Sequence, residues 1–382
     1  MKIKNKKIIF INQSSGYLMI DIVNAFHREY QEAILMTGHF IKRYTDLDNY
    51  AKIDRITAYR RQNMISRLYS WTLATVQIAI KLLFKYSKGY DLFLVSNPPI
   101  AVFLPLLFKK KYSLLIYDIY PDILIKHHVL KENSIISKWW NSVNLQVFNK
   151  ASNIFTISEG MADCLTKYTD RNNIKVIPNW TNSSFLKPLA KEGNPFAQEH
   201  HLDDKFIVLY SGNMGISHHI ETIVELATAM KNDRDVLFVL IGEGVQKAEI
   251  ESMVIRDKLN NCVLLPYQKP EMLPFSLSSA DIGVVTLDQE TSSLSVPSKV
   301  YSLMAVGAII LCIGNNNSEL GRIINTYNIG SVFDKDSINE MRTFILNTKN
   351  NKEINRQYSL NSRKASFDFT QENALLYVNN YK

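Results

Sequence analysis

Cysteine is scarce in this chain of 382 residues. Only Cys164, Cys262 and Cys312 occur, and they lie far apart in the sequence. No nearby pair of histidines accompanies them, so we expect neither a disulfide framework nor a zinc site. A reducing compartment fits this cysteine usage.

Long apolar runs are also lacking. The longest apolar windows, 71–84 and 98–108, fall short of the roughly 20 residues that span a bilayer. The segment MKIKNKKIIFIN contains a short apolar run without a small-residue cleavage site, which argues against a cleavable leader. We therefore expect a cytoplasmic protein that does not cross a membrane.

Positive charge is present in excess, but only in one half of the chain. Residues 1–190 hold 26 Lys and Arg against 13 Asp and Glu, whereas residues 191–382 hold 18 against 23. The basic half predicts an anionic partner, and an anionic membrane surface is favoured because no basic stripe interleaved with aromatic residues indicates nucleic acid. A solvated basic face without a partner is the alternative.

Short β-rich apolar runs alternate with helical patterns throughout the chain. In the first half we expect strands at 6–12, 33–38, 91–96, 113–119, 153–158 and 174–179, with helices at 64–86 and 135–149. In the second half we expect strands at 206–212, 236–242, 263–266, 282–287, 308–314 and 330–334. Apolar strands separated by helices predict parallel sheets covered on both faces.

The chain is therefore predicted to form two doubly wound α/β domains. We expect an N-terminal domain at 1–180, a linker at 181–204 rich in Pro, Gly and charge, a C-terminal domain at 205–365, and a C-terminal helix at 366–382 that crosses back to the first domain. Ligands of such sheets bind beyond the carboxyl ends of the strands, so a cleft between the domains is the expected site.

Two glycine turns follow predicted strands of the second half. Gly212, Asn213 and Gly215, with His218 just after them, lie between a strand and a helix, and Gly242-Glu243-Gly244 follows the next strand. Backbone amides in such turns approach anionic groups. Tight turns that let a helix pack on a sheet explain both sequences almost as well.

A third strand-to-helix junction is SLSVPSKVYSLMAVG. Pro297 suits the first helical turn and Gly307 suits its end, while Ser298, Lys299 and Ser302 give the helix start hydroxyls and one ammonium. This combination favours a diphosphate. An ordinary capped helix with a solvated lysine is the alternative.

Taken together, these segments resemble the glycosyltransferases of family 4, which have the GT-B fold. The resemblance rests on SGNMG, IGEG, NCVLLPYQKPEMLP with Tyr267, ADIGVVTL and VPSKVYSLMAVG, and in the first half on SNPPI, DIYPD, FTISEGM and VIPNW. It is greatest to the subgroup of bacterial L-fucosamine and related transferases of surface-polysaccharide assembly. It implies a retaining transfer of a sugar from a nucleotide diphosphate, here expected to be a UDP-sugar such as an N-acetylated aminosugar.

The chain departs from the family at the charged donor contacts. Where the family has an Arg and a Lys on the diphosphate, this chain has Asn213 and His218, so Lys299 is the nearest cation. Where the family has two glutamates, this chain has Leu294 and Ser302. Sugar contacts would then come from the residues just upstream, which are Asp288, Gln289, Ser292 and Ser293.

The first half supplies further candidates. The resemblance implies that Gly16 approaches the donor phosphate, and Asp118 at a strand end could orient an acceptor hydroxyl or take its proton. Asp122 and Glu159 are cleft candidates too, but a helix start explains each of them. We take Asp118 and Lys299 as the catalytic pair.

No cofactor or metal is expected, because no Asp-x-Asp pattern lies in a cleft position, and Asp233-Arg234-Asp235 precedes a strand at the wrong end for ligands. The expected acceptor is a lipid-linked saccharide at the inner membrane face, since residues 65–88 and the FKKKY cluster at 108–112 combine apolar and basic side chains. A core helix is the alternative for residues 65–88. Two rival functions remain open: a nucleotide-sugar epimerase, for which only His127, His128, His218 and His219 are scattered candidates, and a non-catalytic nucleotide-sugar-binding subunit.

Overall fold

The computed structural model describes residues 4–42, 45–49, 51–60, 62–126, 128–287 and 296–381, and the chain divides into two compact units. The first unit comprises residues 1–179 and 371–382, and the second comprises residues 180–370. Each unit is built on one main sheet whose paired strands are all parallel.

The sheet of the first unit has seven strands. Their order across the sheet is β5 (Lys52–Arg55), β3 (Tyr30–Thr37), β1 (Lys4–Ile11), β6 (Tyr90–Val95), β7 (Tyr112–Ile116), β8 (Asn153–Thr156) and β9 (Ile174–Val176). Strands β3 and β5 thus lie on one side of β1, and the later strands, beginning with β6, lie on its other side. Such a reversal marks the place where open parallel sheets bind ligands.

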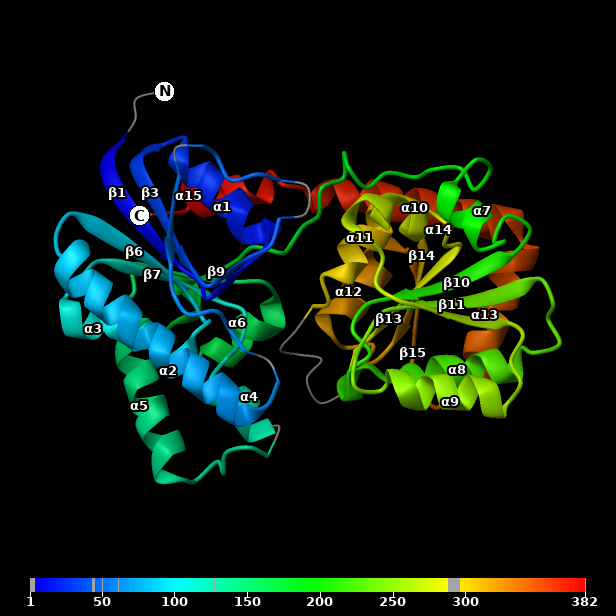
Figure 1. Ribbon diagram of the computed structural model, residues 1–382, viewed down its shortest axis with the longest axis horizontal. Coiled ribbons are helices and arrows are strands. Elements are labelled where there is room, and N and C mark those ends of the chain that lie inside the picture. Colours follow the sequence, from blue (N-terminus) through cyan, green and yellow to red (C-terminus); the bar gives the residue numbers. More distant parts are fainter. Residues whose placement is uncertain are drawn as a thin grey trace. The chain divides into compact units, whose positions relative to one another are not determined.

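Helices cover both faces of this sheet. On one face α1 (Tyr17–His27) packs against α15 (Asn373–Asn379), so the end of the chain completes the first unit (Figure 1). On the other face lie α2 (Met64–Ile80), α3 (Leu104–Phe108) and α5 (Ile135–Lys150). Shorter elements are β2 (Ser14–Ser15), β4 (His39–Phe40), η1 (Lys81–Lys85), η2 (Pro99–Phe103), α4 (Asp122–Lys126), α6 (Glu159–Leu165) and η3 (Arg171–Asn173).

The start of α2 is fixed by a capping box. The Asn63 side chain accepts a hydrogen bond from the backbone N–H of Ser66 at 2.8 Å, and the Ser66 hydroxyl lies within hydrogen-bond distance of the Asn63 backbone. This arrangement satisfies amide groups that the first helical turn leaves without partners. Helix α2 then continues into η1, a π-helical turn, and the two together span the predicted helix at 64–86.

The sheet of the second unit has six strands. Their order is β12 (Cys262–Leu265), β11 (Val236–Ile241), β10 (Phe206–Ser211), β13 (Ile282–Thr286), β14 (Ile309–Ile313) and β15 (Gly330–Phe333). The order reverses between β10 and β13. The loops after these two strands therefore leave the same edge of the sheet, side by side.

Its helices again form two layers. On one face α8 (Ile220–Ala229) contacts α9 (Lys247–Arg256) and α13 (Ile338–Asn350), and on the other α11 (Lys299–Ala305) contacts α10 (Leu273–Ser278) and α14 (Lys352–Ala365) (Figure 1). The remaining elements are α7 (Pro195–Glu199), η4 (Ile216–His218), η5 (Pro270–Met272), α12 (Glu319–Tyr327) and η6 (Ser366–Asp368).

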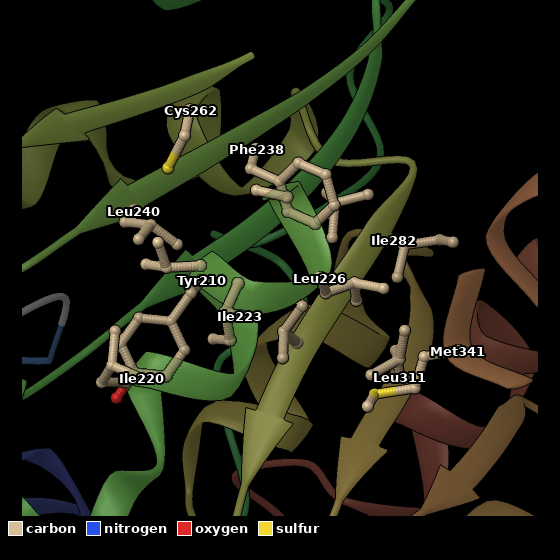
Figure 2. Packing of buried hydrophobic residues seen from close by; sticks show 14 of the residues in the cluster. Tyr210, Ile220, Ile223, Leu226, Phe238, Leu240, Cys262, Ile282, Leu311 and Met341 are labelled. Carbon is tan, nitrogen blue, oxygen red and sulfur yellow. The ribbon is translucent and has the colours of Figure 1, made fainter. Parts of the chain in front are cut away.

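The core of the second unit lies between the sheet and α8. Tyr210, Ile223 and Leu240 pack together there with Phe238 and Leu226, all fully buried (Figure 2). Each such side chain contributes roughly 1.5–3 kcal/mol on burial. Tyr210 thus holds the end of β10 in place, directly before the first glycine turn.

The two-domain α/β prediction is confirmed, and each predicted strand overlaps an observed one, with ends that differ by at most three residues. The boundaries between the two units differ from the predicted linker at 181–204 and the predicted C-terminal helix at 366–382. Residues 181–204 and 366–370 are part of the second unit, because the Thr181 amide donates to Phe369 O at 3.1 Å and Asn194 donates to Phe275 O at 2.9 Å. The sequence analysis missed β5, whose KIDR sequence is polar because it forms the edge of the sheet.

Candidate active site

The two glycine turns of the second unit are bonded to each other. The Met214 amide donates to Glu243 O at 2.9 Å, and the Gly212 amide donates to Ile241 O at 2.9 Å. A Cβ atom on Gly242 would lie 1.9 Å from Gly212 O, and one on Gly244 would lie 2.3 Å from Met214 O. The two turns can approach each other this closely only because both positions are glycine. Gly242 and Gly244 therefore have a structural role.

Lys299 is the most unusual group at this edge. It is the first residue of α11, and its Nζ lies 4.0 Å from the centroid of the Tyr210 ring. The Nζ atom is buried and has no hydrogen-bond partner among the residues that the structure describes. A Cβ atom on Gly212 would lie 3.1 Å from it, so the ammonium group lies directly against the first glycine turn.

Burial lowers the pKa of Lys299 to about 7, and the Cys312 thiol opposes this shift. The solvated lysine considered as an alternative is thus wrong: only part of the residue is exposed, and its charged end is enclosed. A charged group without a partner is costly inside a protein. An anion placed beside Nζ would remove that cost.

His218 and Asn213 lie on the other side of the turn. A Cβ atom on Gly215 would lie 2.7 Å from Asn213 Nδ2 and 3.2 Å from His218 Nδ1, so the absence of a side chain at Gly215 makes room for both. Burial lowers the pKa of His218, and the charge of Lys299 lowers it further. The structure thus brings Gly212, Asn213, Gly215, His218 and Lys299 together, although they come from two separate segments.

The other residues of the second unit that were predicted to contact the donor differ in exposure and in their hydrogen-bond partners. Ser298 and Glu243 are exposed, Pro297 is partly exposed, and Glu243 pairs with Lys247 at 2.8 Å. The ring of Tyr267 is 52% exposed and lies near enough to raise the pKa of Tyr210 further, beyond the larger effect of burial. The Ser302 hydroxyl lies 3.3 Å from Thr181 Oγ1, so it already has a partner within the unit. The sequence could not reveal this contact, because the two residues are far apart in the chain.

The predicted sugar contacts upstream of α11 are not part of this geometry. Asp288, Gln289, Ser292, Ser293 and Leu294 lie outside the described residues, as does His127.

In the first unit, Asp118 lies just beyond the end of β7. Its backbone amide donates to Ser96 Oγ at 3.1 Å, and Ser96 in turn follows the neighbouring strand β6. Asp118 lines a cavity of about 20 Å³ with Ser96, Tyr120, Trp140 and other side chains. Burial raises the pKa of its carboxyl group. A carboxyl group with a raised pKa at a strand end is suited to proton transfer.

The remaining candidates of the first unit have structural roles. Asp122 begins α4 and pairs with Lys167, and Glu159 begins α6 and pairs with Arg171. Gly16 precedes α1, and a Cβ atom there would meet nothing within 4 Å. No steric reason for glycine is therefore found at position 16.

Among the described parts of the chain, no group of three or more His, Cys, Asp or Glu residues is arranged to hold a metal ion. No helix in those parts is both long and apolar enough to cross a bilayer.

Comparison with known proteins gives these features a context. Residues 193–365 match the family model of the glycosyl transferases group 1, a range that covers most of the second unit. The chain is 26% identical over 278 residues to "Probable glycosyltransferase WbjE" of Pseudomonas aeruginosa, covering 71% of this chain and 68% of that protein. It is 28% identical over 183 residues to "Putative colanic acid biosynthesis glycosyl transferase WcaI" of Escherichia coli strain K12, covering 47% of this chain and 44% of that one.

The fold is similar to that of solved structures over nearly the whole chain. The structure of Anabaena HepE in complex with UDP and glucose matches with a TM-score of 0.73 at 12% identity, covering 98% of both chains. The chain therefore has the GT-B fold expected from the sequence. The family match and the two relatives support a glycosyltransferase family for this chain.

Proposed function

We propose that this protein transfers a sugar, with retention of configuration, from a UDP-sugar to a lipid-linked saccharide in the assembly of a surface polysaccharide. The observation that carries the proposal is the enclosed, unpartnered ammonium of Lys299 against the Gly212 turn. The solved HepE structure holds UDP and glucose, and the WcaI name refers to colanic acid biosynthesis, which supports this donor and this class of product.

The proposed donor site has a simple electrostatic basis. The diphosphate lies beside Lys299 Nζ, near His218 and the amides of the glycine turn, and these groups stabilise the negative charge that grows on the leaving phosphate. The exposed ring of Tyr267 is the candidate platform for the nucleobase. Lys299 replaces the Arg and Lys pair that the turn itself lacks, and no bound metal is required.

The proposed reaction breaks the bond between the sugar carbon and the diphosphate oxygen. The acceptor oxygen forms the new bond on the same face of the sugar, and the proton of the acceptor hydroxyl leaves with a base. Asp118 is the candidate base, since it needs to be ionised and its raised pKa makes it a better proton acceptor than an exposed carboxylate.

An exposed apolar stripe on α2 and η1 supports a membrane-borne acceptor. Apolar side chains on one side of these helices face solvent, with Thr72 as the exposed residue between Tyr69 and Val76; we define the apolar stripe as Ile65, Tyr69, Val76, Ile80, Leu83 and Phe84. The opposite side of the same helices carries Trp71, Ala74, Ile78 and Leu82, which are buried in the unit. Trp71 and Leu82 therefore belong to the core of the unit and not to the exposed side of the helix.

Basic residues gather at one end of the apolar stripe. Lys110 donates to Tyr86 O at 2.8 Å and Ser87 O at 2.9 Å, which joins the FKKKY cluster to the end of η1. Lys88, Lys109 and Lys111 are exposed there. Apolar side chains bordered by lysines fit the interface of an anionic bilayer, which supports the proposed location on the inner face of the plasma membrane.

The test is turnover by the whole protein. Labelled UDP-sugars are incubated with a lipid-linked saccharide fraction, and the anomeric configuration of the product is determined by NMR. A labelled glycolipid with the donor's configuration is expected. An isomer formed from donor alone would indicate an epimerase, and nucleotide binding with no product from any lipid acceptor would indicate a non-catalytic subunit.

A further inference from the structure

Four aromatic rings form a continuous row at the carboxyl ends of the first unit's strands. Tyr59 stacks on Trp71 at 5.9 Å between ring centroids, Trp71 meets Tyr120 at 5.7 Å, and Tyr120 stacks on Trp140 at 6.1 Å. Trp71 is buried, while the other three rings are partly exposed. Partly exposed aromatic faces beside a few polar groups are typical of small-molecule sites.

Arg67 lies at this row without a partner. It is one helical turn before Trp71 in α2, its Nε atom is buried, and that atom has no hydrogen-bond partner among the described residues. No ion pair of Arg67 is found there either. A guanidinium group offers five donors in a planar fork that matches an oxyanion. A partly buried guanidinium group without an acceptor is therefore suited to bind an anionic ligand.

Arg67 and Asp118 both influence the pKa of Tyr120. Burial is the largest cause of the raised pKa of Tyr120; the Asp118 carboxylate raises it further and the Arg67 guanidinium opposes the shift. Both charged side chains thus act on the same hydroxyl group. Two further buried atoms nearby in the unit, Asn97 Oδ1 and Trp71 Nε1, have no hydrogen-bond partner in the described structure.

Helix α2 presents Arg67 and the apolar stripe on different sides. Because successive helical residues are turned by about 100°, Arg67 lies on the side of Trp71 and Ala74, whereas Ile65 and Tyr69 face outward. One helix thereby borders a polar, aromatic site and also offers an apolar exterior. This arrangement fits a ligand that joins an anionic group to an alkyl chain.

We propose that the first unit recognises its acceptor through an oxyanion bound by Arg67, with the acceptor saccharide against Tyr120 and Trp140. This inference rests on the proposed function and names its acceptor class: a saccharide that carries a negative charge. The oxyanion is either the phosphate that joins the saccharide to its lipid or the carboxylate of an acidic sugar.

The test is a titration of the full-length protein, followed by tryptophan fluorescence, with two matched pairs of probes. The first pair is glucose linked to citronellyl diphosphate and the neutral citronellyl glucoside; the second is glucuronate and glucose. We expect at least tenfold tighter binding of the charged member in one pair. Preference in the first pair identifies a lipid phosphate, and preference in the second identifies an acidic sugar.

Three variants assign that preference to its residue. In Arg67→Gln the preference should fall by about tenfold to a hundredfold, as expected for the loss of charge-assisted hydrogen bonds, and Arg67→Lys should restore part of it. The control is Arg60→Gln, because Arg60 is exposed and lies over the Tyr69 ring at 5.6 Å. Arg60→Gln should keep the preference.

Absence of a preference in both pairs, or a preference that survives in Arg67→Gln, would overturn the proposal. Equal loss of the charged and the neutral probe in Arg67→Gln would also overturn it, since this result indicates a structural role. Nucleotide binding by the second unit is measured on the same samples. A charge preference without any nucleotide binding would leave the Arg67 site standing and remove the proposed glycosyl transfer.

Discussion

Both units are built on a parallel sheet, but they differ in which buried polar side chains lack a hydrogen-bond partner in the described structure. In the second unit one such group is the Lys299 ammonium, enclosed beside Gly212 and Tyr210. In the first unit one such group is Arg67, which lies with the aromatic row on the inner side of α2, a helix whose outer face is apolar. The same kind of sheet therefore carries two different candidate sites: a small charged enclosure that we propose for a diphosphate, and an aromatic site on a helix that we propose faces lipid.

The largest effect on kcat is expected from a substitution at Asp118 of the first unit. Asp118→Asn should lower kcat by about 10²–10⁴-fold, because the isosteric amide does not accept the hydroxyl proton. Wild-type activity should also fall as the pH decreases toward the raised pKa of this carboxyl group, which needs to be ionised. Both are measured as initial rates of transfer to the lipid-linked fraction.

Asp122→Asn is the matched control, since Asp122 lies four residues away and pairs with Lys167 at the start of α4. It should leave kcat within about threefold of the wild-type value, as expected for a partly exposed ion pair. Equal losses of kcat in the two variants would show that the loop, and not the Asp118 carboxylate, is responsible.

The cost of enclosing Lys299 should be measurable in the unliganded protein. Lys299→Met removes the charge and keeps the length of the side chain, so the free energy of unfolding should rise. Because the folded pKa of about 7 lies below the usual value of 10.5, the gain is complete below pH 7 and disappears as the pH rises toward 10.5. Linkage sets an upper bound of about 5 kcal/mol for the gain.

Denaturant unfolding at pH 6.5 and pH 10 measures this difference. Lys364→Met, a change at an exposed lysine of α14, is the control and should change stability by less than about 0.5 kcal/mol. A Lys299→Met protein that is less stable than wild type at pH 6.5 would mean that the ammonium is already compensated.

The apolar stripe should distinguish the first unit from the second at a membrane. Ile65 is 80% exposed and Phe84 is 76% exposed, and burying either in the bilayer interface contributes up to roughly 1.5–3 kcal/mol. Ile65→Gln with Phe84→Gln should therefore reduce partition into anionic vesicles by at least about tenfold. Co-sedimentation with vesicles measures the partition.

Ile255 is the control residue, because it is 76% exposed on α9 of the second unit. Ile255→Gln should leave the partition unchanged. If wild type stays in the supernatant with anionic and neutral vesicles alike, the membrane surface assigned to the first unit is wrong.

The smallest expected signal is proton uptake at the second unit. At pH 8 free Lys299 is largely neutral, and a diphosphate beside it raises its pKa, so UDP binding should take up between about half and one proton. Calorimetric titrations in Tris and HEPES, which differ in ionisation enthalpy, measure this number. The uptake should be absent from Lys299→Met, and equal uptake in both proteins would assign the proton to another group.

The sequence predicts the sheets well and the site only in part. Apolar runs such as FIVLYSG and AIILCIG have the length and flanking glycines of buried parallel strands, so their positions follow from local pattern alone. The direction of the Lys299 side chain does not follow from local pattern. It depends on Tyr210, which lies in strand β10. The sequence favours a diphosphate site at Lys299 but leaves a solvated lysine open as the alternative.

Helix α2 shows a second limit of sequence patterns. Its residues are apolar on nearly every side, so periodicity does not distinguish the buried row of Trp71 and Ile78 from the exposed stripe of Val76 and Ile80. Arg67 is the only charged residue in this helix, yet the sequence analysis did not single it out. The role that we propose for Arg67 depends on the fold, which brings Tyr120 from a distant segment close enough for Arg67 to affect its pKa.

Thermal unfolding of wild type and Lys299→Met with UDP, GDP, ADP, CMP and dTDP tests the central claim most directly. A nucleotide at about 100 times its dissociation constant should stabilise wild type by roughly 2.7 kcal/mol. We predict that UDP alone does so, and that Lys299→Met, although more stable without ligand, loses the response. No stabilisation of wild type by any of the nucleotides, or an equal response in the variant, would contradict the account of Lys299 as the diphosphate site.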